Sequence, residues 1–439
     1  MSFAQKSFSL FKRDAFLFFA NTLTSVIIAR KLGPEIMGVW ILLSLIPIYA
    51  ESFGRLKFDI ASVYFLGKGL YAEKDVERTL NSVAIIVSLI ICVPTIVFSK
   101  QICIYLFNGS TVNLFYLRLV ILQIPFSFLY MNYSYLLIYK ENTKVYNVMT
   151  VIKALVGSFG ALILILLFDL GISAVVITSF ASVLLALLYG YYKSSIKSTI
   201  KYDLLNLQMV RDFSGYAVKL YLSGIIGNLN AYIMRTLLTK VLVISKLTFF
   251  SIAQDRATFL NKIPEAINML LFSRISKADS DIEKNELASK GLRLVFLSTL
   301  IAGILAFLFI KPLVWILYGN DYLPMVAPFI CFIPGVIASG CISLLIQYFN
   351  GINKGNAQLF IYSMILILQV LLVFLFWSNL TLITASICFS ISMVLTFVFS
   401  LFLFLKYSKL SIDSIYINRN DFEYLYNFLK ERVVSLLPN

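Results

Sequence analysis

Charged side chains interrupt several long apolar stretches of this sequence. Glu51, Arg55 and Asp59 lie in one such stretch, each four residues from the next. On a helix this spacing places all three on one face, where opposite charges can form ion pairs. A charge within a bilayer costs about 3 kcal/mol even on lenient scales, so such residues usually face a cavity or a partner. This first charged group predicts either a structural link between helices or part of a polar cavity wall.

A second charged group lies in a later apolar stretch and contains Asp255, Arg256, Lys262 and Glu265. Arg256 has no acidic residue three or four positions away, so its partner must be another helix, water or an anionic ligand. Lys262 can be neutralised by Glu265, three residues further on. Pro264 predicts a kink in this helix. We expect Arg256 to face an aqueous cavity.

Basic residues outnumber acidic ones within the apolar stretches. Lys153 and Lys219 lie close enough to the predicted inner helix ends to reach the lipid headgroups, and Arg118 lies near an outer end. A net-basic cavity favours an anionic ligand, and arginine binds the oxygens of a diphosphate well. The seven basic residues are Arg55, Lys57, Arg118, Lys153, Lys219, Arg256 and Lys262, and the five acidic ones are Asp14, Glu51, Asp59, Asp255 and Glu265.

Other kinds of chemistry find little support. The chain has no histidine, which removes the usual acid–base catalyst and the commonest metal ligand. Its five cysteines lie in or beside apolar stretches without a C-x-x-C pair, so we interpret them as small hydrophobic residues. We therefore expect no cofactor, no metal and no catalytic residues.

The composition is that of an all-α integral membrane protein. Of the 439 residues, 60% are hydrophobic and only 13% are charged, with a mean hydropathy of +0.88. A helix needs about 20 apolar residues to span a bilayer, and the long continuous stretches fit helices better than a β-barrel. The sequence predicts about twelve spans, at 14–32, 36–65, 80–99, 114–139, 147–168, 171–192, 213–235, 247–271, 292–317, 325–349, 358–377 and 380–405.

The distribution of basic and aromatic residues predicts the orientation. With the N-terminus inside, most loop lysines and arginines fall on the cytoplasmic side, so both termini should be cytoplasmic. Trp40, Trp315 and Trp377 then lie near outer helix ends, where aromatic belts form. The fewer basic residues assigned to outer loops and helix ends are Arg30, Lys31, Lys100, Arg235, Lys240, Lys246 and Lys311.

The chain carries signs of an internal repeat. The segment FSKQICIYLFNG (98–109) aligns with FIKPLVWILYGN (309–320), and Lys144 and Lys354 occupy matching short loops. Two parallel six-helix halves around a central cavity are a transporter architecture. We predict an N-terminal bundle at 1–192, a basic cytoplasmic linker at 193–212, a C-terminal bundle at 213–405 and a cytoplasmic tail at 406–439. In the tail, helical spacing predicts either an amphipathic helix or a frayed end, from Phe422, Leu425, Leu429, Val433 and Leu436.

One segment resembles a known signature. The stretch IIARKLGPEIMGVWILLSL (27–45) resembles the first-loop motif of polysaccharide flippases in the multidrug/oligosaccharidyl-lipid/polysaccharide exporter (MOP) superfamily. The similarity continues through 270–279, 292–324 and 347–365, and it is strongest to the Wzx-type O-antigen flippases. It implies a MATE-like fold of two six-helix bundles around a central cavity. Lipid II flippases of this superfamily carry an Asp-Arg pair that Asp255 and Arg256 match, but Thr24 and Ser25 replace their first-helix Arg-Asp pair.

The resemblance implies a flippase of the bacterial inner membrane. Such a protein moves undecaprenyl-diphosphate-linked oligosaccharide, such as an O-antigen repeat unit of lipopolysaccharide, from the inner to the outer leaflet by alternating access. Its partners would be this substrate, membrane lipids and polysaccharide assembly proteins, with no nucleic acid. Two alternatives remain open: a cation-coupled drug exporter of the same superfamily, and a membrane polysaccharide polymerase or ligase. We predict substrate contacts at Arg256, Arg55, Asp255, Lys262, Glu51 and Asp59.

Overall fold

A computed structural model describes residues 3–110, 113–193, 206–262, 280–352 and 354–417, together with single positions between 264 and 278. Most of the predicted linker, and the tail residues Phe422, Leu425, Leu429, Val433 and Leu436, lie outside the described residues. Predictions for those segments remain predictions.

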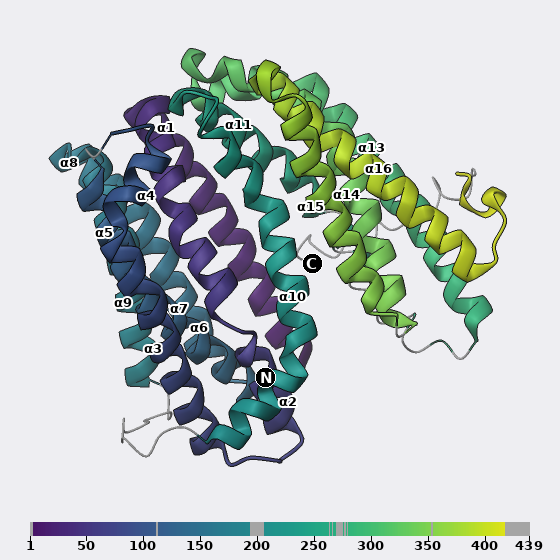
Figure 1. Ribbon diagram of the computed structural model, residues 1–439, viewed down its shortest axis with the longest axis horizontal. Coiled ribbons are helices and arrows are strands. Elements are labelled where there is room, and N and C mark those ends of the chain that lie inside the picture. The colour runs from purple at the N-terminus through teal and green to yellow at the C-terminus, as the bar shows by residue number, and fades with distance from the viewer. Residues whose placement is uncertain are drawn as a thin grey trace, which may run out of the picture. The chain divides into compact units, whose positions relative to one another are not determined.

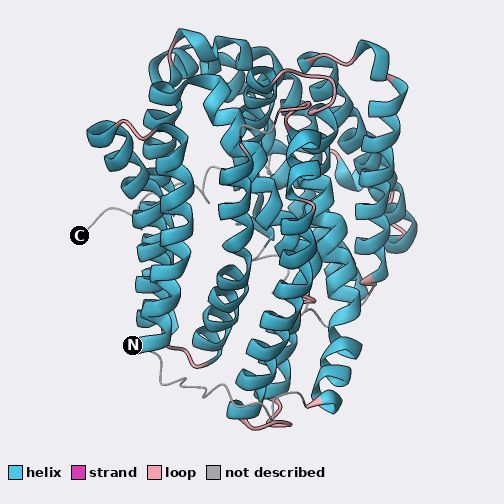
Figure 2. Ribbon diagram, turned by 60° about the vertical axis from the view of Figure 1, so that its left-hand side comes forward, coloured by secondary structure: helices cyan, strands magenta, loops and turns pink. Residues whose placement is uncertain are grey.

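The described residues form helices joined by short loops, without a strand (Figure 2). This confirms the all-α membrane fold, because nine described helices are long and apolar enough to cross a bilayer. The count of twelve spans remains a prediction. The nine are Ala20–Gly54, Glu73–Val97, Leu114–Tyr139, Thr143–Phe168, Gly171–Lys193, Asp281–Tyr318, Asn320–Gly351, Asn356–Leu375 and Leu382–Ser408.

The chain forms two compact units, which are described separately here. Unit 1 is Met1–Tyr232 with Thr236–Thr248, and unit 2 is Ile233–Arg235 with Phe249–Asn439. The predicted halves divided at 193–212 remain a prediction. Most of α10 (Leu207–Leu238) falls within unit 1, and α11 (Ile244–Thr258) spans the boundary between the two ranges (Figure 1).

Unit 1 begins with α1, which runs Phe3–Gly54 and bends at Gly33. Gly33 has a φ of 75°, a conformation that glycine adopts at little cost, and Pro34 follows it as the first residue of the next helical run. The sequence placed its first two spans on either side of this point. The other helices are α2 (Phe58–Gly67), α3 (Glu73–Val97), α4 (Ser99–Leu106), α5 (Leu114–Leu122), α6 (Ile124–Tyr139), α7 (Thr143–Ala154), α8 (Gly160–Phe168) and α9 (Gly171–Lys193).

Unit 2 is built around closely packed helices. Its α14 (Val326–Gly351) and α16 (Leu382–Ser408) cross where Gly335 meets Ser390, and the Gly335 N–H donates to the Ser390 hydroxyl at 3.2 Å. Small residues at such crossings let membrane helices approach each other closely. The remaining helices are α13 (Asp281–Tyr318) and α15 (Asn356–Leu375).

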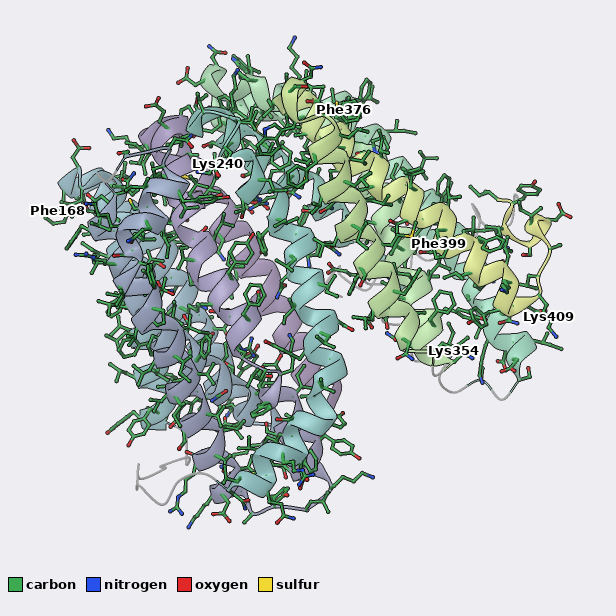
Figure 3. The ribbon with its side chains drawn as sticks, in the orientation of Figure 1. Phe168, Lys240, Lys354, Phe376, Phe399 and Lys409 are labelled. Atoms are coloured by element: carbon green, nitrogen blue, oxygen red, sulfur yellow. The ribbon has the colours of Figure 1, made fainter. Side chains whose placement is uncertain are left out.

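Three labelled residues mark the two ends of unit 2. Figure 3 shows Lys354 and Lys409 at one end and Phe376 at the other. Which of these ends faces the cytoplasm remains a prediction. In unit 1, Phe168 and Lys240 lie toward the same end (Figure 3).

Candidate functional site

The second span predicted from the sequence, 36–65, is interrupted in the structure. Helix α1 ends at Gly54 and α2 begins at Phe58, and between them Leu56 and Lys57 have φ values of 52° and 57°. This left-handed conformation costs about 1–2 kcal/mol for each residue that has a Cβ. The prediction of one continuous helix over 36–65 is therefore wrong at this point. Strained backbone of this kind concentrates at binding and catalytic sites.

Helix α10 covers the interruption with polar contacts. The Tyr221 hydroxyl donates to the Phe53 carbonyl at 2.6 Å, and the Asn228 amide donates to the Ser52 hydroxyl at 2.9 Å. The Lys57 stem packs so closely on Gly224 that a Cβ there would lie 2.7 Å from Lys57 Cε. Irregular backbone at membrane depth is tolerated where it is buried in protein or lines a wet cavity. The contacts with α10 meet the first condition.

A pocket also opens beside the interruption. It has a volume of about 310 Å³ and lies wholly within unit 1. Charged, amide and hydroxyl side chains form much of its wall. We call it the α1–α2 pocket, and its lining residues are Ile48, Glu51, Ser52, Arg55, Leu56, Lys57, Tyr221, Asn228 and Tyr232.

The first charged group comes together at this pocket. Arg55 Nη2 forms an ion pair with Asp59 Oδ2, and the two side chains are only 14% and 2% exposed. Glu51 lines the pocket and its charge acts on Arg55. The predicted contact between Arg55 and Asp59 is present, although the two residues lie on either side of a break and not on one continuous helix. Arg55 also lies 5.7 Å from the centre of the Tyr135 ring.

Lys153 extends this group from α7. Its Nζ lies 4.5 Å from the centre of the Tyr130 ring, and its charge interacts with those of Glu51 and Arg55. The expectation that Lys153 reaches the headgroups is therefore wrong, because the side chain points into unit 1. A π-helical turn, Leu155–Phe159, follows directly. Such turns are frequent at functional sites.

The charges around the α1–α2 pocket leave one positive charge in excess. Arg55, Lys57 and Lys153 are basic, and Glu51 and Asp59 are acidic. The ion pair with Asp59 uses one nitrogen of Arg55, and a guanidinium has five N–H donors in all. Donors remain for a ligand, and the Lys57 ammonium adds three more. The pocket is suited to binding an anion that accepts several hydrogen bonds.

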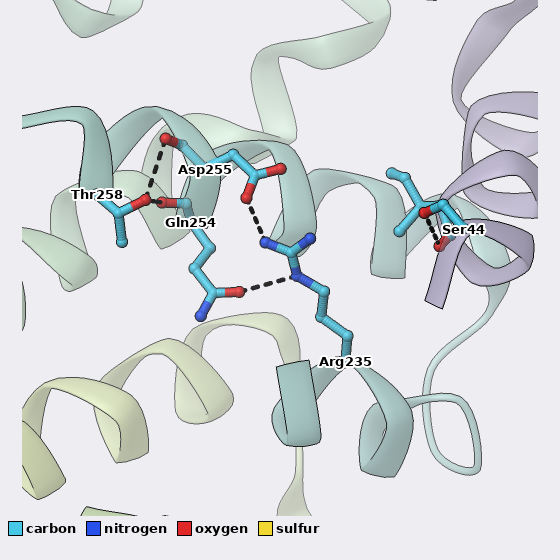
Figure 4. Close-up of polar contacts among 6 residues, drawn as sticks. Ser44, Arg235, Gln254, Asp255 and Thr258 are labelled. Atoms are coloured by element: carbon cyan, nitrogen blue, oxygen red, sulfur yellow. Dashed lines mark hydrogen bonds and ion pairs between the residues drawn. The ribbon is translucent and has the colours of Figure 1, made fainter. Parts of the chain in front are cut away.

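The second charged group lies in unit 2, and its contacts differ from those expected. Asp255 pairs with Arg235, and Arg235 Nε also donates to Gln254 Oε1 at 3.0 Å (Figure 4). Arg235 is buried and lies in the last turn of α10, the helix end predicted for it, and its place on the outer side remains a prediction. Arg256 is half-buried and donates through Nε to the Tyr318 hydroxyl at 2.9 Å. Whether Arg256 faces an aqueous cavity remains a prediction.

The end of the same span is polar and changes helix type. Lys262 and Glu265 form an exposed ion pair at 2.6 Å, the neutralisation that their spacing predicts. A 3₁₀ turn, Phe259–Asn261, interrupts the α-helical geometry before Pro264. Asn261 donates to Ser339 at 2.8 Å and ties this segment to α14.

Comparison with known proteins identifies the family. A family described as polysaccharide biosynthesis protein matches residues 70–327, which is more than half of the chain. Comparison with curated proteins gives no match.

Several solved structures share the fold. An inward-facing multidrug resistance MATE family transporter of the MOP superfamily is 16% identical, with a TM-score of 0.71 over 89% of this chain and 96% of its own. The lipid II flippase MurJ, in an inward closed conformation, is 13% identical, with a TM-score of 0.71 over 99% and 94%. The Vibrio cholerae MATE transporter VcmN in its bent form has a TM-score of 0.58 at 13% identity, covering 92% and 98%.

At identities of 13–16%, the structural matches establish the fold. The family match runs from just before α3 to the start of α14. The chain is a multi-pass membrane protein that belongs to the polysaccharide biosynthesis protein family and has the fold of MOP-superfamily transporters.

Proposed function

We propose that this protein is a flippase that moves a lipid-linked oligosaccharide from the inner to the outer leaflet of a bacterial inner membrane. The carrier would be undecaprenyl diphosphate, and both termini would be cytoplasmic. Membership of a polysaccharide biosynthesis family and the fold shared with a lipid II flippase support this function. An O-antigen repeat unit of lipopolysaccharide is the cargo favoured by the sequence resemblance.

The observation that carries the proposal is the α1–α2 pocket. It joins an interrupted membrane helix, a net positive charge and several neutral hydrogen-bond donors in one place. Transporters commonly bind substrate at discontinuous helices, where the ends of the two helical segments supply polar backbone groups. A diphosphate matches the pocket because it is anionic and accepts many hydrogen bonds.

In the proposed mechanism, the diphosphate enters the α1–α2 pocket and displaces water from Arg55 and Lys57. The polyprenyl tail stays in the bilayer, since moving it into a polar pocket would lose its hydrophobic burial. Alternating access then exposes the headgroup to the other leaflet. Arg256 is proposed as a second cationic contact, with Asp255 and Lys262 beside it.

A drug exporter of the same superfamily is the competing function, since one of the structural matches is a multidrug transporter. A cationic drug would need unpaired carboxylates in its site. Among the residues that line the α1–α2 pocket, Arg55 and Lys57 are basic and Glu51 alone is acidic. The nearby Asp59 is already paired with Arg55. The charge of this pocket therefore favours the flippase.

Replacing Lys57 by alanine should abolish most transport without removing the protein from the membrane. A charge-assisted hydrogen bond to phosphate is worth about 1.5–3 kcal/mol, so affinity should fall about 10- to 100-fold. The measurement is surface polysaccharide in cells whose flippase gene is deleted and which carry the variant. Lipid-linked precursor should accumulate at the same time.

Three further variants separate charge from backbone strain. Lys57→Gly should be as inactive as Lys57→Ala although it relieves the left-handed strain, and Lys57→Arg should retain activity. Lys74→Ala, which removes an exposed lysine on α3, should behave as wild type. Normal surface polysaccharide in both Lys57→Ala and Lys57→Gly would overturn the assignment of the pocket.

A further inference from the structure

Two tyrosines stack face to face at the end of α2 away from the pocket. The rings of Tyr64 on α2 and Tyr216 on α10 are nearly parallel, with centroids 4.4 Å apart and an interplanar angle of 17°. Both residues are partly open to the surroundings, at 42% and 38% exposure. We call them the tyrosine pair.

Other aromatic side chains hold the tyrosine pair in place. Phe65 lies edge-on to Tyr216 at 6.0 Å and stacks on the buried Phe213 at 5.1 Å. Phe213 in turn meets the edge of Tyr71, whose hydroxyl donates to Asp212 on α10. A packed aromatic support fixes the ring orientation, so binding a ligand there would lose little side-chain entropy.

The tyrosine pair continues the line of contact between α2 and α10 that begins at the pocket. Tyr64 is seven residues after Lys57, a rise of about 10 Å along a helix. On α10, Tyr216 precedes by eight residues the Gly224 on which Lys57 packs. Lys68, which follows the last residue of α2 and lies four residues beyond Tyr64, is exposed. The tyrosine pair thus lies about two helical turns from Lys57 along the contact between α2 and α10.

We propose that the tyrosine pair is a saccharide-binding surface that holds a pyranose ring of the lipid-linked oligosaccharide while its diphosphate occupies the α1–α2 pocket. Pyranose rings present a face of C–H groups that packs on aromatic rings, and their hydroxyls bond to neighbouring polar groups. The rise of about 10 Å between Lys57 and Tyr64 is a length that a few linked sugars can span. This inference rests on the proposed function and adds to it the residues that recognise the sugar.

The test compares two ligands on the purified full-length protein in nanodiscs. One is the lipid-linked oligosaccharide that accumulates in host cells lacking the flippase, and the other is polyprenyl diphosphate without sugar. Tyr64→Ala and Tyr216→Ala should each weaken binding of the first ligand about 10-fold and leave binding of the second unchanged. Tyr64→Phe keeps the ring and should bind both as wild type.

The control is Tyr192→Ala, which removes an exposed tyrosine at the same end of unit 1 and should bind both ligands normally. Equal affinity of Tyr64→Ala and wild type for the glycosylated ligand would overturn the inference and leave the proposed function standing. An equal loss of affinity for both ligands would also overturn the inference, since it would indicate a structural role of Tyr64 at the membrane interface. If Lys57→Ala bound both ligands normally, the assignment of the diphosphate to the α1–α2 pocket would fail.

Discussion

Replacing Arg55 by alanine should abolish transport and destabilise unit 1. Arg55 and Asp59 form a buried ion pair, and removing one partner of such a pair leaves an uncompensated charge that costs about 3–5 kcal/mol. The α1–α2 pocket also loses one of its two lining cations. We expect no detectable surface polysaccharide in cells and a clearly lower thermal unfolding midpoint for the purified protein.

The double variant Arg55→Ala with Asp59→Ala separates these two effects. Removing both charges of a buried pair is often close to neutral for stability, so the unfolding midpoint should return toward that of wild type. Transport should stay lost, because the ligand still lacks the guanidinium. Recovery of transport in the double variant would show that Arg55 serves only to balance Asp59.

Gly335→Ala should severely weaken unit 2. A Cβ on Gly335 would lie 2.7 Å from both Cα and Oγ of Ser390 on α16. Since Cα belongs to the backbone, the methyl group fits only if α14 and α16 move apart. Overpacking costs about 1–3 kcal/mol, and more where backbone must shift. The expected result is a lower unfolding midpoint and less protein in the membrane.

Gly215→Ala is the matched control for this prediction. Gly215 lies in α10, and, apart from the adjoining residues and backbone of its own helix, no atom lies within 4 Å of the position that its Cβ would occupy. Replacing a helical glycine by alanine in open space should raise stability by about 0.4–1 kcal/mol. If Gly335→Ala were as stable as this control, the close crossing of α14 and α16 would be wrong.

The features that follow from local sequence were predictable. The apolar stretches are long enough to require membrane helices, and the Gly33–Pro34 pair separates the first two of them. The ion pair of Lys262 with Glu265 follows from a spacing of three residues on one helix. Each depends only on residues close together in the chain.

The interruption at 55–57 was not predictable in this way. Neither Leu56 nor Lys57 favours a left-handed conformation, and the break is supported by Tyr221 and Asn228 from a helix far along the chain. The one local signal is the polar run GRLKFD (54–59) within an otherwise apolar stretch. The hydropathy pattern is the same whether these residues lie on a continuous helix or at a break between two helices.

The sequence also does not predict which residues contact three of the basic side chains. The direction of Lys153 depends on Tyr130 and Glu51, which lie on other helices. The burial of Arg235 depends on Gln254 and Asp255, which come nearly twenty residues later. Arg256 reaches Tyr318, at the far end of α13. Charge within an apolar stretch marks such residues as important, but only the fold selects their partners.

The most direct measurement is photo-cross-linking of the headgroup to its site. A lipid-linked oligosaccharide with a photoreactive group beside the diphosphate would be added to membranes containing the wild-type protein, and the adducts would be mapped by mass spectrometry. We predict adducts within 48–57 and 221–232, the two segments that line the α1–α2 pocket, and their loss in Lys57→Ala. Adducts confined to other segments, with none in these two, would contradict the proposed site.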